Sequence, residues 1–303
     1  MDRKQVTVLG DRELILTNLT KVLWPDAGLT KAHLVQYYTR VAPYLLPHLA
    51  RRPLTVIRYP QGISEKGFYQ KQCPPYAPQW IKRYPVASQH GITEYILAKE
   101  PATLAWLANQ GAIEIHPWLS TIEHPDHPNQ IVIDLDPAPG CSWSDVVLVA
   151  KLVRKLLEQL DLVGFVKTSG ATGLHICIGI PPKYDFQVTS SFVAYIGQLL
   201  ERTIPEKVTT ERLVRKRAGR VYVDHLQNLP GKTIVAPYSV RARSQAPVST
   251  PLLWEELDAI TPDQFTITNL FSRLEQHGDL LAPLLNHPQS IDHVLPLFRH
   301  LLA

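Results

Sequence analysis

The sequence predicts a mixed α/β fold of the α+β kind, in which strands and helices intermix without a regular βαβ spacing. Short runs of apolar residues at 112–116 and 131–136 have the composition and length of strands. Residues 145–160 instead place apolar side chains at i, i+3, i+4 and i+7, which is the spacing of an amphipathic helix. Hydrophobic residues make up 45% of the 303 residues, enough to bury a sizeable core.

The first 120 residues are predicted to contain a hairpin, two helices and two strands. Gly10 and Asp11 supply the turn of the hairpin, and Thr30 can cap the first helix. The expected elements are the hairpin 5–16, a helix at 31–46, a strand at 53–59, an irregular segment rich in Pro and aromatic residues at 60–90, a helix at 101–110 and a strand at 112–116.

The remainder of the chain is predicted to alternate strands with two long helices. Ser144 is a suitable N-cap for the helix at 145–160. The expected elements are strands at 131–136, 164–168, 174–180, 221–224 and 233–236, helices at 145–160 and 188–203, and a helical, Pro-interrupted stretch over 258–303.

Composition excludes several classes of protein. The three cysteines are scattered and form neither a zinc motif nor a disulfide framework. The charged N-terminus lacks the apolar segment of a signal peptide, and no uncharged apolar run is long enough to cross a membrane. A formal charge of +4 permits a nucleic-acid partner without requiring one. We therefore expect a soluble cytoplasmic protein.

The stretch IVIDLDPAPG at 131–140 is the most informative motif. Asp134 and Asp136 end a predicted strand, and side chains at i and i+2 point to the same face of a strand. Two carboxylates held so close repel each other unless a cation lies between them, and oxygen ligands suit Mg²⁺ or Mn²⁺. The pattern indicates a metal site at a strand end. A solvated strand end or a helix cap could contain the same two aspartates.

Two further motifs bring chemistry of the same kind. In TSGATGLHI at 168–176, the glycines allow a sharp turn, and Ser169 and His175 could join backbone amides in holding phosphate oxygens. Asp224 ends the strand-like VYVD and would complete a two-metal site if it meets the first acid pair. A plain turn with a buried histidine, and a structural Asp224, are the alternatives.

Cations and aromatic residues supply the remaining parts. The run RLVRKRAGR at 212–220 includes Arg217 and Arg220 and contains no acid. In KTIVAPYSVRAR at 232–243, Lys232, Arg241 and Arg243 flank a predicted strand, and Arg241 and Arg243 could grip a triphosphate, although a solvated charged strand end is the alternative. The segment GFYQKQCPP at 67–75 combines aromatic faces with a cation, as base-stacking surfaces do, although adjacent aromatics also enter cores. Taken in order, these motifs contain every part that nucleotidyl transfer needs.

The combined order DLDP, SGxxGLH, VxVDxxQN and KTxxAPYSxRxR resembles the polymerase domain of bacterial and archaeal DNA ligase D. The similarity runs from about residue 14 to residue 257 and includes NLTKVLWP, RYPQGI, AIEIHPW and PLLWEEL. That family belongs to the archaeo-eukaryotic primase superfamily and serves non-homologous end joining. The resemblance implies a primase-like catalytic core, with an RRM-like sheet carrying the acids and antiparallel or mixed sheets around a cleft flanked by helices.

The resemblance also assigns roles to individual residues. Asp134, Asp136 and Asp224 would bind two divalent ions, Mn²⁺ or Mg²⁺, and perform the catalysis. The residues that would bind the nucleotide are Ser169, His175, Lys232, Arg241, His116, Phe68 and Tyr69. Lys21 and Lys31 would hold the 5′-phosphate of a recessed end, and the local sequence makes Lys71, Arg217 and Arg220 further candidate DNA contacts. The family commonly prefers ribonucleotides and works on gapped or overhanging DNA ends.

Two positions depart from the family pattern, because Thr172 replaces a frequent loop lysine and His225 replaces an aromatic residue. We expect one catalytic domain over 1–260, with DNA-end contacts in about 1–120 and the metal site in 121–260, followed by a helical extension at 261–303 packed on the same domain. No KxDG ligase motif is found, so we expect a stand-alone, nucleoid-associated polymerase that works with Ku and a separate ligase.

Three functions fit these motifs. The first is a template-dependent nucleotidyltransferase that fills gaps and ends during the joining of double-strand breaks. The second is a primase-polymerase of replication or damage tolerance, which would start chains without a primer. The third is a non-catalytic module that bridges DNA ends, against which the acid triad argues because carboxylates that face DNA would repel it.

Overall fold

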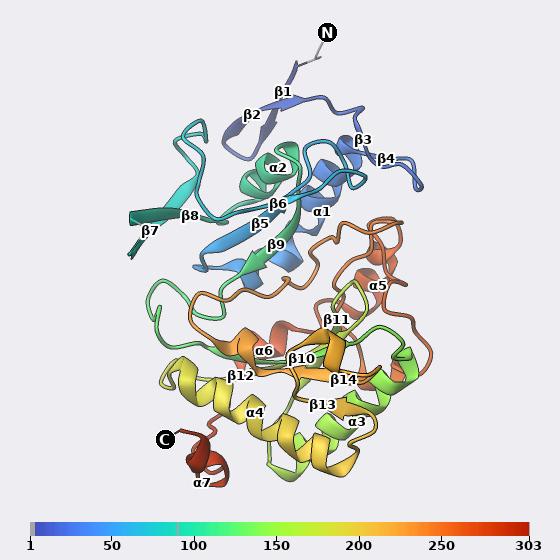
Figure 1. The fold of residues 1–303 in the computed structure, drawn as a ribbon. Coiled ribbons are helices and arrows are strands. Elements are labelled where there is room, and N and C mark those ends of the chain that lie inside the picture. Colours follow the sequence, from blue (N-terminus) through green and yellow to red (C-terminus); the bar gives the residue numbers. More distant parts are fainter. Residues whose placement is uncertain (1–3, 90, 303) are drawn as a thin grey trace. The chain divides into compact units, whose positions relative to one another are not determined.

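The computed structural model describes residues 4–89 and 91–302, and the chain divides into two compact units (Figure 1). The first unit comprises the residues up to Trp118 together with 233–249 and 265–273. The second comprises 119–232, 250–264 and the residues from Leu274 onward. The expected mixed α/β fold is confirmed, since both units combine antiparallel pairs with helices. Within the described residues, none of the helices is at once long enough and apolar enough to cross a bilayer.

The first unit is built on a sheet in the order β6-β5-β8-β7, with β9 paired to β5. Its helices α1 and α2 pack against each other. The elements are β1 (Lys4–Leu9), β2 (Arg12–Thr17), β3 (Val22–Trp24), β4 (Leu29–Thr30), α1 (Lys31–Leu49), β5 (Leu54–Arg58), β6 (Phe68–Gln70), β7 (Lys82–Ser88), β8 (Gly91–Leu97), α2 (Pro101–Asn109) and β9 (Ala112–Pro117).

The local sequence explains the start and the buried face of α1. Thr30 occupies the N-cap in an extended conformation, as predicted, and its backbone N–H donates to Nδ1 of His33 at 3.0 Å. Leu34, Val41 and Leu45 follow the helical period and are fully buried. The predicted hairpin is confirmed as well, with β1 paired to β2 in antiparallel register.

The second unit is built on a five-stranded sheet in the order β11-β12-β10-β14-β13, antiparallel except for the last pair. Its regular elements are β10 (Gln130–Pro137), α3 (Trp143–Gln159), β11 (Phe165–Thr168), β12 (Leu174–Gly179), α4 (Phe186–Thr203), β13 (Val208–Thr209), β14 (Val221–Asp224), α6 (Ala282–Asn286) and α7 (Leu295–Phe298). Short 3-10 turns lie at 214–216, 225–228, 254–256 and 299–301, and α5 (Leu270–His277) carries the chain from the first unit to the second.

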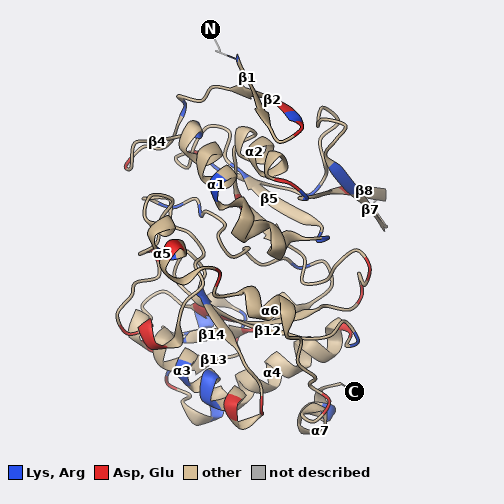
Figure 2. Ribbon diagram, turned by 180° about the vertical axis from the view of Figure 1, so that it is seen from behind, with Lys and Arg blue, Asp and Glu red and all other residues tan. Residues whose placement is uncertain are grey.

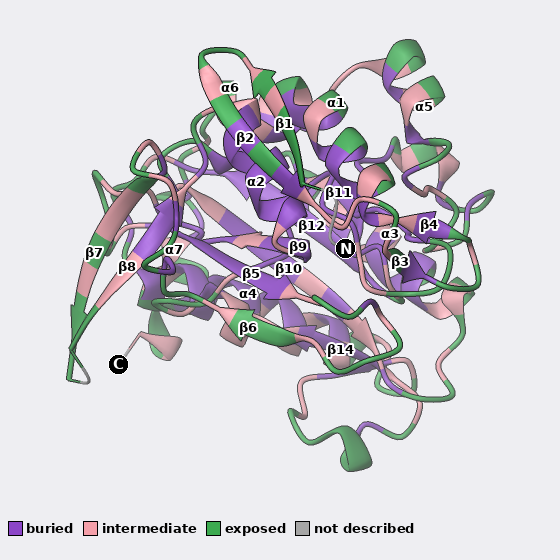
Figure 3. Cartoon of the chain, turned by 90° about the horizontal axis from the view of Figure 1, so that it is seen from above, coloured by how far each residue is buried: buried purple, intermediate pink, exposed green. Residues whose placement is uncertain are grey.

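Helices α3 and α4 cover one face of this sheet, where both contact β10 and β14 (Figure 1). The central strand β10 is apolar over residues 131–133, and its side chains Ile131, Ile133 and Leu135 are fully buried. Because alternate residues of a strand point to opposite faces, Asp134 and Asp136 lie on the face of the sheet opposite to these three residues. Figure 3 shows that β10 contains both buried and intermediate residues.

The structure differs from the sequence predictions at several places, among them the short strands β3, β4 and β13, which were not predicted. Helix α3 begins two residues earlier than expected, because Ser142 rather than Ser144 is the N-cap, and its Oγ accepts from the N–H of Asp145 at 3.2 Å. The segment 60–90 is not irregular throughout, since it contains β6 and β7. Residues 233–236 form no regular strand, although Thr233 bridges to Trp118 and the N–H of Ala236 donates to the carbonyl of Ile115.

Candidate functional site

The three acids of the predicted metal site lie on two neighbouring strands of the second unit. In the antiparallel register of β10 and β14, Asp134 lies directly opposite Asp224, and Asp136 lies opposite Tyr222. Because alternate residues of a strand share a face, Asp134, Asp136 and Asp224 all project from the same side of the sheet. The register thus brings together residues that are far apart in the sequence.

Each of the three carboxylates also has a partner of its own. Oδ2 of Asp136 accepts from Nη1 of Arg217 at 2.7 Å, and Oδ1 of Asp224 accepts from the N–H of Leu226 at 2.9 Å. Oδ1 of Asp134 lies 3.4 Å from Nε2 of His175. In the part of the chain that the structure describes, no three His, Cys, Asp or Glu side chains converge into a ready-made metal site. The acids share a face, but their side chains turn to different partners.

A buried lysine stands behind His175. Lys167 on β11 is 1% exposed, and its Nζ lies 2.8 Å from Nδ1 of His175 on β12. The registers place Lys167 opposite His175 and His175 opposite Asp134, so the three side chains form a row across adjacent strands. Because an ammonium group only donates, Nδ1 of His175 accepts, and Nε2 then carries the hydrogen toward Asp134.

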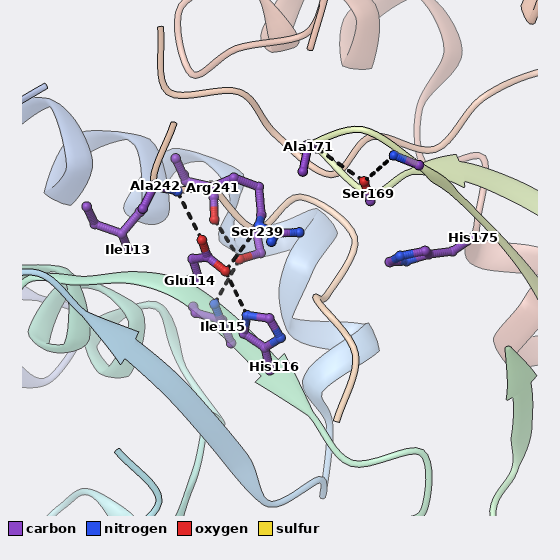
Figure 4. A network of polar contacts seen from close by, with 12 residues as sticks. Ile113, Glu114, Ile115, His116, Ser169, Ala171, His175, Ser239, Arg241 and Ala242 are labelled. Carbon is purple, nitrogen blue, oxygen red and sulfur yellow. Dashed lines mark hydrogen bonds and ion pairs between the residues drawn. The ribbon is translucent and has the colours of Figure 1, made fainter. Parts of the chain in front are cut away.

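The Gly-rich loop between β11 and β12 is held by its own serine. Oγ of Ser169 accepts from the backbone N–H groups of Gly173 at 3.0 Å and Ala171 at 3.2 Å (Figure 4). Gly170 has a φ of +69°, which favours glycine, and Thr172 at the loop's tip is exposed. The Ser169 hydroxyl therefore shapes the loop, a role that the sequence did not reveal.

The basic run contributes one buried and one half-buried arginine. Arg217 is 6% exposed, stacks over the Tyr222 ring at 4.0 Å and donates from Nε to the carbonyl of Glu211. Arg220 donates from Nε to the carbonyl of Arg217 at 2.9 Å. Both arginines therefore stabilise the loop that precedes β14 through hydrogen bonds to its backbone. The predicted site residue Lys232 is exposed. In Figure 2, blue Lys and Arg positions and red Asp and Glu positions lie along the ribbon of this unit, near β13, β14 and α3.

The first unit contains a second group of predicted site residues, around the buried carboxylate of Glu114 on β9. Oε2 of Glu114 lies 3.0 Å from Nε2 of His116 and 3.0 Å from Nε of Arg241 (Figure 4). The structure thus brings His116 and Arg241 together through a residue that sequence reasoning missed. The available signal was the i, i+2 spacing of Glu114 and His116 on one strand.

The remaining predicted contacts also lie in the first unit. Phe68 and Tyr69 on β6 are 46% and 71% exposed, and Arg58 stacks over the Phe68 ring at 5.4 Å. Lys71 is exposed beside them. The exposed rings can therefore stack on bases, as the prediction requires.

Lys21 and Lys31 differ in their surroundings. Nζ of Lys31 is buried and donates to the carbonyl of Asn109 at 3.0 Å and to Oγ1 of Thr17 at 3.3 Å. Nζ of Lys21 donates to the side-chain oxygen of Gln61. Lys31 is therefore fixed by buried partners inside the first unit, whereas Lys21 is held at the surface by the amide of Gln61.

The fold and the acid-bearing sheet define a primase-polymerase type of protein, and the family comparison agrees. The family model of the LigD primase-polymerase domain matches residues 30–281, and the chain belongs to that family. It is similar to the multifunctional non-homologous end joining protein LigD of Mycolicibacterium smegmatis, with 36% identity over 89% of this chain. It is 35% identical, over 91% of the chain, to the bifunctional non-homologous end joining protein LigD of Bacillus subtilis.

A solved structure extends this similarity to three dimensions. The polymerase domain from Mycobacterium tuberculosis ligase D in complex with DNA matches with a TM-score of 0.85 and 36% identity, covering 91% of this chain and 99% of that domain. The similarity covers only 36% of the Mycolicibacterium smegmatis protein and 45% of the Bacillus subtilis protein. The present chain therefore corresponds to the polymerase portion of those longer proteins.

Proposed function

We propose that this chain is a template-dependent nucleotidyltransferase that fills gaps and ends of DNA during non-homologous end joining. The observation that carries the proposal is the placement of Asp134, Asp136 and Asp224 on one face of a sheet. The chain that contains this sheet belongs to the family of LigD primase-polymerase domains. The DNA in the related mycobacterial structure and the end-joining names of the relatives support the choice of substrate.

The acids fit a pair of divalent cations. Asp134 and Asp224 face each other directly across an antiparallel pair, where like charges destabilise a sheet unless something compensates them. The donors are all carboxylate oxygens, which suits Mg²⁺ or Mn²⁺. When bound, two such ions would lower the pKa of a primer 3′-hydroxyl and neutralise the charge of an incoming triphosphate.

The other residues of the second unit would hold and orient the reactants. Nε2–H of His175, held by Lys167 behind it, is a donor at the edge of the acid face. The loop of Ser169 would present its backbone amides, and Lys232 its ammonium group, to phosphate oxygens. Arg217 neutralises Asp136 and would exchange this carboxylate for another partner when a cation arrives.

The first unit would supply contacts to nucleotide and DNA. His116 and Arg241 would bind the triphosphate, and Phe68 and Tyr69 would stack on a base. The proposed DNA contacts of the first unit are Lys21, Lys31 and Lys71, and those of the second unit are Arg217 and Arg220. A preference for ribonucleotides and cooperation with Ku and a ligase belong to the same proposal.

The test is nucleotide incorporation by acid variants on a gapped duplex. Asp134→Asn and Asp136→Asn should each lower incorporation by about three orders of magnitude or more, as expected for essential metal ligands, while DNA affinity changes little. Asp258→Asn is the matched control, because this aspartate pairs with Lys151 on the surface of the same unit. Incorporation retained by both acid variants would contradict the proposed chemistry, whereas DNA binding by an inactive wild type would favour an end-bridging module.

A further inference from the structure

The carboxylate of Glu114 is the most unusual charged group of the first unit. Its neighbours in β9, Ile113 and Ile115, are fully buried, and the Glu114 side chain itself is only 6% exposed. A buried carboxylate is costly unless it is paired and hydrogen-bonded, so its presence in a strand requires a compensating set of donors. Glu114 contacts both His116 and Arg241, the two residues proposed to bind the triphosphate from this unit.

Two hydrogen bonds and one ion pair reach the two oxygens of Glu114. Oε2 faces Nε2 of His116 and Nε of Arg241, both at 3.0 Å, and Oε1 accepts from the backbone N–H of Ala242 at 3.1 Å. Figure 4 shows the carboxylate lying between the imidazole ring and the arginine segment. One carboxylate therefore fixes a side chain of its own strand and both the side chain and the backbone of a distant segment.

The donors keep this carboxylate ionised. Burial alone would raise the pKa of Glu114, but the hydrogen bond from His116, the charge of Arg241 and the N–H of Ala242 together lower it to about 2. Glu114 is therefore an anion at neutral pH, its contacts with His116 and Ala242 are charge-assisted hydrogen bonds, and its contact with Arg241 is an ion pair.

The segment that carries Arg241 is anchored independently of this charge. The N–H of Ile115 donates to Oγ of Ser239 at 2.8 Å, and the N–H of Ala236 donates to the carbonyl of Ile115 at 2.9 Å. Tyr38 closes the arrangement, because its hydroxyl donates to the carbonyl of Ile113 and accepts from the N–H of Val240. The backbone position of the segment thus has several supports, whereas Glu114 orients the Arg241 side chain.

We propose that Glu114 is a positioning residue for the nucleoside triphosphate, acting through His116 and Arg241. The ion pair at Nε holds the guanidinium group of Arg241 beside Glu114, and the hydrogen bond at Nε2 of His116 sets the ring and the site of its proton. Both groups are then oriented before a polyphosphate arrives. This inference rests on the proposed function, because it requires a triphosphate to be bound there.

A neutral amide cannot replace the carboxylate at this position. The side chain of Glu114→Gln keeps the size, but it carries no charge to pair with Arg241 and has one oxygen for the two N–H donors of His116 and Ala242. The loss of charge-assisted hydrogen bonds should raise the KM for the nucleotide about ten- to hundredfold. The kcat should change much less, since Glu114 is not among the acids on the sheet of the second unit.

The experiment measures KM and kcat for ATP incorporation opposite dT in a gapped duplex with Mn²⁺, and the binding of α,β-methylene ATP by calorimetry. The variants are Glu114→Gln, Arg241→Gln and their combination. Glu100→Gln is the control, because Glu100 pairs with Arg12 at 3.0 Å on the surface of the same unit. Thermal melting checks folding, and the double variant remains informative if the single one is unstable, because it removes both partners of the buried pair.

A raised KM, weaker binding of the analogue and a double variant whose loss is smaller than the sum of the two single losses would support the proposal, since residues that act through each other are not additive. Wild-type KM and analogue affinity in Glu114→Gln would overturn it while leaving the proposed function intact. Additive effects of the two substitutions would also overturn it. A wild type that neither incorporates nor binds the nucleotide would instead overturn the proposed function, and this inference with it.

Discussion

The close contact between Gly173 and β10 gives the sharpest test of how the Gly-rich loop supports the acids. A Cβ atom added at Gly173 would lie 2.2 Å from the carbonyl oxygen of Leu135, whereas real Cβ atoms essentially never approach below 3.0 Å. The two backbones would have to separate by about 0.8 Å. Leu135 lies between Asp134 and Asp136, so Gly173→Ala must displace either the acids or the loop of Ser169.

The size of the effect follows from the rigidity of packed backbone. Overpacking costs about 1–3 kcal/mol, which at about 2–4 °C per kcal/mol lowers the Tm by roughly 2–12 °C. A displacement near 1 Å at reacting groups can cost about a hundredfold in rate. We therefore expect Gly173→Ala to stay folded at 25 °C but to lose about two orders of magnitude in nucleotide incorporation.

Gly179→Ala is the matched control for this prediction. Its Cβ would lie 2.3 Å from the carbonyl oxygen of Leu284, so it clashes to the same degree at the far end of the same strand, β12. Both variants should melt earlier by similar amounts in calorimetry, and only Gly173→Ala should lose incorporation at 25 °C. Wild-type activity in Gly173→Ala, or equal losses in both variants, would refute the reasoning.

Three further predictions follow from the ion pairs and the buried lysine. Arg217→Gln removes the charge that neutralises Asp136, so Mn²⁺ should bind several-fold more tightly in a paramagnetic-resonance titration; unchanged affinity would contradict competition for this carboxylate. The folded pKa of Glu114, about 2, lies below its ordinary value of 4.5, so this group contributes stability above about pH 4.5, about 3 kcal/mol at most, which is lost as pH falls toward 2. The free energy of unfolding of Glu114→Gln, measured with urea, should therefore fall less than that of the wild type as the pH is lowered from 4.5 toward 2. Lys167→Met should free Nδ1 of His175, giving mixed tautomers in ¹⁵N NMR where the wild type shows only Nε2–H.

The sequence was sufficient where the structure depends on local patterns. Asp134 and Asp136 share a face because of the two-residue period of a strand, and Thr30 caps α1 because of its hydroxyl and its position. The N-cap of α3 was misplaced by two residues, since Ser142 and Ser144 are both competent caps. The packing of Trp143, whose Nε1 donates to the carbonyl of Ile260, accompanies the earlier start.

The sequence was insufficient where partners come from distant segments. Glu114 looks like the solvent-facing member of an alternating strand, and its partner Arg241 lies in another part of the chain. Arg217 belongs to a basic run typical of a DNA contact, yet its side chain is buried against Asp136. Strand β7 escaped prediction because it contains Pro85, which is tolerated there since β7 is an edge strand.

The measurement that tests the central claim most directly is single-nucleotide incorporation on a gapped duplex, with and without a 5′-phosphate at the gap. Ribonucleotides and deoxyribonucleotides are compared in Mn²⁺, with Asp134→Asn as the inactive reference. The account predicts metal-dependent incorporation that is stimulated by the phosphate, favours ribonucleotides and is abolished in the variant. Incorporation that ignores the phosphate would point to a general primase-polymerase. No incorporation with either metal would contradict the account.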